Sequence, residues 1–210
     1  MTDAKRLGVL AFEGFEELDA VGPYEVFGNA RDRGADLAVE LLATEDTDRV
    51  SAALGLTVEP DGRLPQGGTG GSDAGLDYLL VPGGGWNDDS GTGTRALVAD
   101  EDTLDALRRL HAAGTTLLGV CTGGMVLTEA GLLAGRPAVT HHGAMADLRE
   151  TGADVVEARV VDDGDVLTCG GVTAGIDLAL WLVEREFGTD LADAVASVME
   201  YDRSEDVVGG

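Results

Sequence analysis

Lysine is almost absent from this sequence, because Lys5 is the only one in 210 residues. Lysine and arginine together number 14 against 39 aspartates and glutamates, which gives a formal net charge of −25. The acidic residues are spread along the chain rather than gathered in a tail, so the charge belongs to a folded surface. Such a surface is typical of a protein from a high-salt cytoplasm, and an ordinary acidic protein is the alternative. It repels phosphate backbones, which argues against nucleic-acid binding.

Long apolar runs are also missing. No stretch of about 18 or more apolar residues occurs, so we expect no membrane partner. The apolar stretch near the N-terminus is short and is followed directly by Glu13, which does not fit a signal peptide. We therefore expect a cytoplasmic protein. The chain has two cysteines, Cys121 and Cys169, and neither lies in a small loop-rich framework, so both are interpreted as thiols.

The hydrophobic content of 44% in 210 residues is enough for one core, and we predict a single domain over residues 1–210. Short apolar runs alternate with longer amphipathic segments. This alternation predicts an α/β fold with a doubly wound, mostly parallel sheet flanked by helices, whose ligand sites lie at the carboxyl ends of strands. The pattern predicts strands at 6–12, 37–44 and 115–120, and a buried strand that runs into glycines within 76–86. It predicts helices within 15–34, 94–114, 122–135, 173–188 and 189–201. It also predicts a short extended pair at 50–61, a glycine-rich surface loop at 62–75 and a hairpin around Asp163 and Gly164.

Cys121 lies in the segment GVCTGG, residues 119–124, at the end of an apolar strand pattern. The motif G-x-C-x-G fits a nucleophile elbow, in which a strand turns sharply into a helix and presents the nucleophile at the turn. At the start of a helix the macrodipole lowers a thiol pKa from its free value of about 8.5, so we expect a thiolate nucleophile here. A small buried cysteine that fills a tight strand end is the alternative.

Two further segments support a catalytic site. Three consecutive glycines, 83–85, follow another predicted strand, where their bare amides could face a developing oxyanion beside the amide of Thr122; a plain tight turn is the alternative. Asp19 follows the first strand among apolar neighbours. Partial desolvation would raise the pKa of this carboxyl and let it exchange a proton with a thiol. Its alternative role is that of a helix N-terminal cap.

Four segments together resemble the PfpI/ThiJ superfamily, and within it the isonitrile hydratase branch. The resemblance implies a flavodoxin-like α/β fold related to class I glutamine amidotransferases. It covers nearly the whole chain in order. The matching segments are F-x-G-F-x-x-L-D-x-x-G-P-Y-E-V-F at 12–27, L-x-V-P-G-G-G at 79–85, V-C-T-G-G-x-V-L-x-x-A-G-L-L-x-G-R-x-A-x-T-H at 120–141 and G-G-V-T-A-G-I-D at 170–177.

The resemblance implies a set of site residues and partners. Cys121 would be the nucleophile and Asp19 its acidic partner. Backbone amides near Gly84 and Thr122 would form the oxyanion site, with Gly85 as possible support. The resemblance also implies a homodimer that acts on a small molecule and needs no metal or organic cofactor.

Histidine usage favours the hydratase branch. Peptidase-like members have a histidine directly after the nucleophile, but this chain has Thr122 there, which suits the hydratase branch. His141 follows Cys121 by 20 residues and could approach the site. It lacks an acidic residue two positions on, so no Cys-His-Glu triad can be assigned. His141 is either a hydrogen-bonded polar residue at a strand end or a supporting catalytic residue.

Five other residues carry expectations. Cys169 stands where the resemblance would lead one to expect serine, and we interpret it as a small core residue. Asp177 lies in the first turns of a predicted helix and is interpreted as structural. Trp86 and Tyr24 are candidates to line the pocket, or else surface or core residues. His111 is expected to be exposed on a polar helix.

We therefore predict a cysteine-dependent small-molecule hydratase or lyase that converts isonitriles to N-substituted formamides. One alternative is a glyoxalase or deglycase that acts on 2-oxoaldehydes through the same thiol. A second is a redox-sensing stress protein in which Cys121 is oxidised. A third is a ligand-sensing domain like those fused to AraC-type regulators, which the absence of a helix-turn-helix pattern disfavours.

Overall fold

The structure, a computed structural model, describes residues 4–66, 75–88 and 91–210. Its strands are β1 (Lys5–Ala11), β2 (Leu37–Ala43), β3 (Val50–Ser51), β4 (Thr57–Val58), β5 (Gly62–Arg63), β6 (Tyr78–Val81), β7 (Thr116–Gly119), β8 (Pro137–Ala138), β9 (Asp154–Val155), β10 (Val160–Asp162), β11 (Val166–Cys169) and β12 (Val207–Gly209). Eight of these strands form the central sheet, in the order β12-β10-β11-β7-β6-β1-β2-β5. Every pairing in this sheet is parallel except that of β10 with β11.

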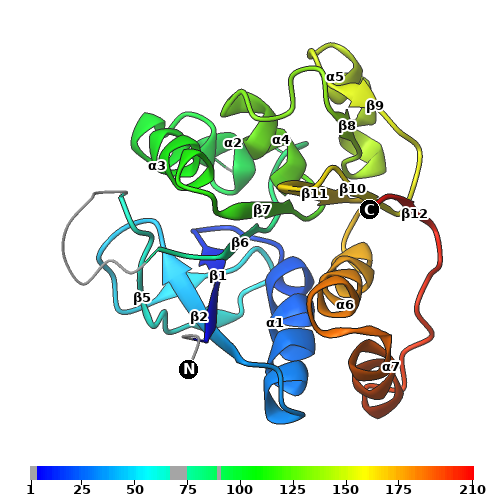
Figure 1. Cartoon of the computed structure of the whole chain (residues 1–210). Helices are drawn as coiled ribbons and strands as arrows, with labels where there is room; N and C mark the ends of the chain where they lie inside the picture. The colour runs from blue at the N-terminus through cyan, green and yellow to red at the C-terminus, as the bar shows by residue number, and fades with distance from the viewer. Residues whose placement is uncertain (1–3, 67–74, 89–90) are drawn as a thin grey trace.

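Helices pack on both faces of the sheet (Figure 1). They are α1 (Glu17–Asp32), α2 (Thr94–Leu97), α3 (Glu101–Ala112), α4 (Gly123–Glu129), α5 (Met145–Arg149), α6 (Ala174–Phe187) and α7 (Thr189–Val198), with a 3₁₀ turn at His142–Ala144. Helices α1, α6 and α7 pack together on one face, and α2, α3 and α4 on the other. Among the described helices, none is long and apolar enough to cross a membrane.

The predicted fold class is confirmed. Strands β6 and β7 lie in the middle of the sheet and are covered by helices on both faces, so their buried residues are consecutive rather than alternating. The hairpin around Asp163 and Gly164 is the antiparallel pair β10 and β11. The extended pair within 50–61 is the antiparallel pair β3 and β4.

Three predicted helices differ from their expected bounds, and the last of them, expected over 189–201, ends at Val198. The segment 94–114 is two helices, because the side chain of Asp100 accepts a hydrogen bond from the amide of Asp102 and caps a new start at α3. The helix expected over 122–135 ends at Glu129, since Gly131 adopts a left-handed φ of 76° and stops it. Most of the loop predicted at 62–75 lies outside the described residues, and its first two residues form β5.

The carboxyl ends of β1, β6, β7 and β11 meet at one edge of the sheet. The chain leaves β1 for the start of α1, leaves β6 for the glycine run 83–85 and leaves β7 for Cys121. Ligand sites of open α/β sheets lie at this edge.

Candidate active site

The turn after β7 holds Cys121 in a left-handed conformation with a φ of 57°. This conformation is uncommon for a residue with a side chain and costs on the order of 1–3 kcal/mol. Hydrogen bonds on both sides maintain it. The amide of Cys121 donates to the carbonyl of Gly170 at 3.1 Å, and its carbonyl accepts from the hydroxyl of Thr140 at 2.8 Å.

The glycines around Cys121 are required by close backbone contacts. A Cβ on Gly123 would lie 2.0 Å from the carbonyl oxygen of Val81 in β6. A Cβ on Gly119 would lie 3.0 Å from the backbone of Gly124 in α4. The spacing G-x-C-x-G-G therefore brings β6, β7 and α4 together at the elbow, as the motif predicts.

Asp19 lies in the first turn of α1 with its side chain fully buried. Its Oδ2 accepts a hydrogen bond from the amide of Gly83 at 2.9 Å, and the carboxyl interacts with the thiol of Cys121. Burial is the main cause that raises the pKa of Asp19 to about 7. The carboxyl faces the elbow rather than the amides of its own helix, so it does not act as a helix cap.

The sulfur of Cys121 accepts hydrogen bonds from the amides of Val172 and Thr122, and both lower its pKa. Burial and the charge of Asp19 act more strongly in the opposite direction, and together they raise the pKa of Cys121 to about 12. The expectation of a lowered pKa is therefore wrong. Helix α4 begins at Gly123, and only 6% of Cys121 is exposed, so desolvation outweighs the helix dipole.

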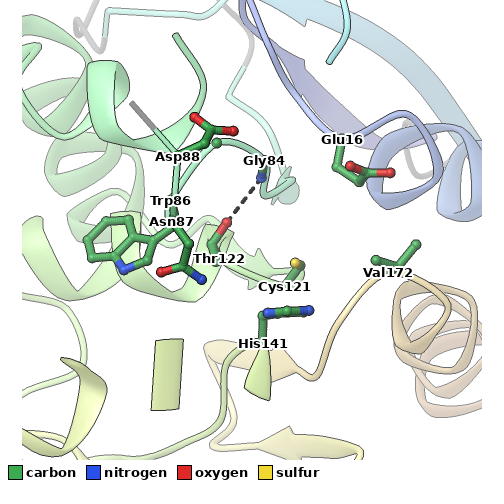
Figure 2. A pocket seen from close by; sticks show the side chains of 10 residues that line it. Glu16, Gly84, Trp86, Asn87, Asp88, Cys121, Thr122, His141 and Val172 are labelled. Atoms are coloured by element: carbon green, nitrogen blue, oxygen red, sulfur yellow. Dashed lines mark hydrogen bonds between the residues drawn. The ribbon is translucent and has the colours of Figure 1, made fainter. Parts of the chain in front are cut away.

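The amides expected to form an oxyanion site are engaged in the structure. The amide of Gly84 donates to the hydroxyl of Thr122 at 3.0 Å, which Figure 2 marks with a dashed line. The amide of Thr122 points at the sulfur of Cys121. Gly84 and Gly85 have φ values of 125° and 64°, and a Cβ on Gly84 would lie 2.5 Å from the carbonyl of Gly14. The glycine run is therefore a close-packed turn. For the amide of Gly84 to bind a substrate atom, its hydrogen bond to the hydroxyl of Thr122 would first have to break.

A cavity of about 280 Å³ opens above Cys121. Figure 2 shows the Cys121 sulfur, His141 and the side chain of Glu16 around this space, with Trp86 and Asn87 on one side. The lining consists of Glu16, Gly84, Gly85, Trp86, Asn87, Asp88, Cys121, Thr122, His141 and Val172.

His141 reaches this cavity from the segment after β8. Its Nδ1 accepts a hydrogen bond from the amide of Gly143 at 3.1 Å, which assigns the ring proton of the neutral form to Nε2. Burial and the neighbouring His142 lower the pKa of His141, so the ring is neutral near pH 7. A Cβ on Gly171 would lie 2.2 Å from the ring, so glycine at that position leaves the space the ring occupies.

The remaining candidates divide as follows. Trp86 lines the cavity, whereas Tyr24 lies on the outer face of α1 and lines a different hollow. His111 is only 21% exposed and bonds Asp165 at 3.0 Å, so the expectation of an exposed residue is wrong. Cys169 is fully buried, as expected for a core residue.

Asp177 also has the structural role expected of it. Its buried carboxylate accepts hydrogen bonds from Arg159, Tyr201 and the amide of Ser204. These contacts attach the segment before β12 to α6.

Sequence reasoning missed two residues of the site. Val172 has a φ of 45°, which is an outlier for a β-branched residue. In this conformation the amide of Val172 donates to the Cys121 sulfur. Its place in the run GGVTAG was visible, but no motif predicts a strained valine. Glu16 lines the cavity from the residue before α1, and its position three residues before Asp19 was the available signal. Within the described residues, no group of three or more His, Cys, Asp or Glu side chains could hold a metal ion.

The sequence and the fold of this chain are similar to those of known proteins. Residues 5–185 match the DJ-1/PfpI family. Over 199 residues the chain is 38% identical to an isonitrile hydratase of Pseudomonas putida, covering 94% of this chain and 79% of that protein. It is 34% identical to the HTH-type transcriptional regulator CdhR of Pseudomonas aeruginosa, covering 89% of this chain and 52% of the regulator. A crystal structure of a ThiJ/PfpI family protein from Pseudomonas syringae superposes with a TM-score of 0.81 at 30% identity, covering 95% of this chain and 76% of that one.

Proposed function

This chain belongs to the DJ-1/PfpI family, and we propose that it is a cysteine-dependent hydratase that converts isonitriles to N-substituted formamides. Family membership alone does not decide this, because the relatives include a hydratase and a transcriptional regulator. The observation that carries the proposal is the buried pair of Asp19 and Cys121 beneath a cavity of about 280 Å³.

The pair supplies the proton transfers that the reaction requires. An isonitrile carbon must gain both a nucleophile and a proton. As the Cys121 sulfur bonds to this carbon, Asp19 takes the thiol proton and delivers it to the same carbon, which gives a thioimidate. Water then adds to the thioimidate carbon, and the sulfur leaves with a proton, which releases the formamide and restores the thiol. The net reaction adds one water to the isonitrile and needs no oxidant.

Asp19 suits both directions of proton transfer. Its pKa of about 7 lies near neutrality, where a carboxyl can accept and return a proton with little loss. The thiol is protonated at rest because its pKa is raised to about 12, so the nucleophile forms only when Asp19 accepts the proton. The amides of Thr122 and Val172 stabilise the developing charge on the sulfur.

The proposed activity is tested by incubating the purified protein with an isonitrile in multimolar salt and detecting the formyl proton of the product by NMR. We expect formamide to accumulate with the native protein and not with the Cys121→Ser variant. Product at the rate of the protein-free blank would refute the proposal. A regulator would instead bind the isonitrile without consuming it.

A 2-oxoaldehyde is the second candidate substrate, and His141 is the observation that favours it. Conversion of a 2-oxoaldehyde to a 2-hydroxy acid on the thiol moves a proton between neighbouring carbons, and His141 gives the cavity a second proton-transfer group. Methylglyoxal in the same assay separates the two activities. A redox-sensing role is less well supported, because a thiol with a raised pKa reacts slowly with peroxides.

We also propose that the protein is a homodimer that works in a high-salt cytoplasm. Leu18, Val21 and Tyr24 are exposed large side chains on one face of α1, at helical spacing. Leu54, which is 82% exposed, lies in the β3–β4 hairpin, and its amide bonds the side chain of Glu17 on the same helix. An apolar face on a chain with a net charge of −25 is a place where two copies can meet without bringing carboxylates together.

A further inference from the structure

Among the described residues, the lining of the cavity above Cys121 includes two acidic side chains and no lysine or arginine. Glu16 and Asp88 contribute carboxylates to the lining, and Asp19 lies directly beneath it. His141 is the one other titratable side chain of the lining besides Cys121, and burial together with His142 lowers its pKa, so it supplies no positive charge near neutrality.

Glu16 places a carboxylate at the edge of this cavity. Its side chain lies on the rim facing Cys121 and Val172 (Figure 2). Within the described residues, no hydrogen bond or ion pair engages its carboxylate. Burial and the charge of Glu17 raise the pKa of Glu16, which means that the site already disfavours negative charge.

Two guanidinium groups lie near this cavity without lining it, and each is paired with another carboxylate. Arg95 stacks on the ring of Trp86 at 3.8 Å and lines an adjoining hollow with Asp147. This hollow shares Trp86, Asn87 and Asp88 with the Cys121 cavity, but Arg95 itself does not line the cavity. Its Nη2 lies 3.6 Å from Asp147, so this carboxylate offsets part of its charge. Arg159 is likewise held by the buried carboxylate of Asp177.

From this arrangement we propose that the Cys121 cavity accepts neutral and cationic electrophiles and rejects anionic ones, and that Glu16 is the specificity-determining residue. A carboxylate-bearing substrate would place a second negative charge near Glu16 in a partly desolvated space. Two like charges about 6 Å apart repel strongly enough to change a rate by about three-fold in water and about a hundred-fold at a protein surface. The proposed hydratase would thus accept alkyl isonitriles and amine-bearing isonitriles but not isocyanoacetate. The inference deepens the proposed function, but its test does not require turnover.

The test measures how fast Cys121 reacts with three methanethiosulfonates of different charge. The trimethylammonioethyl reagent is cationic, the methyl reagent is neutral and the sulfonatoethyl reagent is anionic. The Cys169→Ser background leaves one thiol, and multimolar salt screens the overall charge of the protein while a partly buried pair is screened much less. Labelling is followed by intact mass spectrometry.

We expect the anionic reagent to react at least about ten times more slowly than the neutral one, and the cationic reagent to react no more slowly than the neutral one. Glu16→Gln should speed the anionic reagent by about three-fold or more and leave the neutral reagent unchanged. Glu25→Gln is the matched control, because Glu25 is exposed on α1 away from the cavity and its loss changes the net charge equally.

Equal rates for the anionic and neutral reagents in the Glu16-containing protein would overturn the inference. So would the same acceleration in Glu16→Gln and Glu25→Gln, because overall charge would then explain the selectivity. Asp88→Asn provides a second variant on another segment and should change the anionic rate in the same direction. If labelling follows charge but no isonitrile is hydrated, the proposed function fails and the cavity's selectivity stands.

Discussion

The carboxyl of Asp19, in the first turn of α1, and the thiol of Cys121, in the turn after β7, form one buried pair at the carboxyl edge of the sheet. Burial and the charge of Asp19 raise the pKa of Cys121. Burial also raises the pKa of Asp19 to about 7, although the hydrogen bond with the thiol acts to lower it. The two groups therefore titrate as a pair that carries one negative charge above about pH 7. In the proposed reaction, the thiol would therefore be activated by Asp19 during attack rather than ionised beforehand.

Alkylation of Cys121 tests this pair. In the native protein, labelling by iodoacetamide should rise as the pH passes about 7, because ionised Asp19 can then accept the thiol proton. In Asp19→Asn this rise should disappear, and turnover should fall by roughly 10² or more. Rapid-quench labelling followed by mass spectrometry gives the rate, and Cys169→Ser should behave like the native protein. An unchanged pH profile in Asp19→Asn would show that the carboxyl does not act on the thiol.

The choice between the two cysteines is tested in the same experiment. Cys169 is fully buried, and burial raises its pKa well above the ordinary value, so we expect no labelling there before the protein unfolds. Peptide mapping after partial alkylation identifies the modified thiol. If Cys169 reacted first, the roles of the two residues would have to be exchanged.

The sequence was sufficient for the fold and for the residues of the elbow. Alternating apolar runs define the strands, and the glycines around Cys121 are required by contacts that any elbow of this kind makes. It was less informative about short elements. Strand β12 is three residues long and forms because Asp177 and Arg159 hold the preceding segment, an interaction no local pattern contains. The assignment of 1–210 to a single domain stays a prediction.

The electrostatics of the site could not be predicted from the sequence. The helix start after Cys121 suggested a lowered pKa, but the result depends on how completely the sulfur is buried and on where Asp19 lies, both of which are tertiary properties. Val172 was missed because no local sequence pattern predicts a left-handed φ for a β-branched residue.

Replacement of Gly171 by alanine should displace His141. The new Cβ would lie 2.2 Å from the imidazole ring, which must move, whereas a Cβ on Gly170 would meet its nearest atom at 3.7 Å. We therefore expect Gly171→Ala to lower turnover to the level of His141→Ala, and Gly170→Ala to leave it nearly unchanged. Both losses should be smaller than that of Asp19→Asn. Steady-state kinetics on the active substrate compares the four variants; a larger loss for His141→Ala than for Asp19→Asn would favour a Cys-His mechanism.

The dimer proposal is tested at the apolar face of α1. Light scattering should give the mass of two 21.6 kDa chains for the native protein. Tyr24→Glu should shift it toward one chain, because a buried carboxylate without a partner is costly at an interface. Val198→Glu is the control, since Val198 is 50% exposed on α7, outside this face. Equal behaviour of the two variants would exclude this face as the interface.

Salt dependence tests the halophilic interpretation. With 39 acidic and 14 basic residues, like charges repel across the folded surface, and a Debye length of about 3 Å at 1 M salt removes most of this repulsion. We expect the melting temperature to rise steadily from low to multimolar potassium chloride. Sucrose is the control, because it favours compact states without screening charge. Melting curves that do not change with salt would contradict the interpretation.

Replacing Asp19 by asparagine should stabilise the protein at high pH, whereas most substitutions of a carboxylate remove stability there. Asp19 has a folded pKa of about 7 against an ordinary value of 3.8, so between these values the folded state binds more protons than the unfolded state. Stability from this group is therefore present at low pH and is lost as the pH rises toward about 7. Ionising the buried carboxyl costs up to about 4 kcal/mol, since one pKa unit corresponds to about 1.4 kcal/mol.

Asparagine keeps an oxygen for the amide of Gly83 and carries no charge to bury. We expect Asp19→Asn to be more stable than the native protein to chemical denaturation near pH 8, and the difference to vanish near pH 4. Unfolding curves at a series of pH values, all in the same high salt, measure it. Asp61→Asn serves as the control, because Asp61 is exposed and its carboxylate accepts a hydrogen bond from the amide of Leu41 at the protein surface. A native protein that is the more stable of the two at pH 8 would mean that Asp19 is stabilised as a carboxylate, and the proton transfer assigned to it would lose its physical basis.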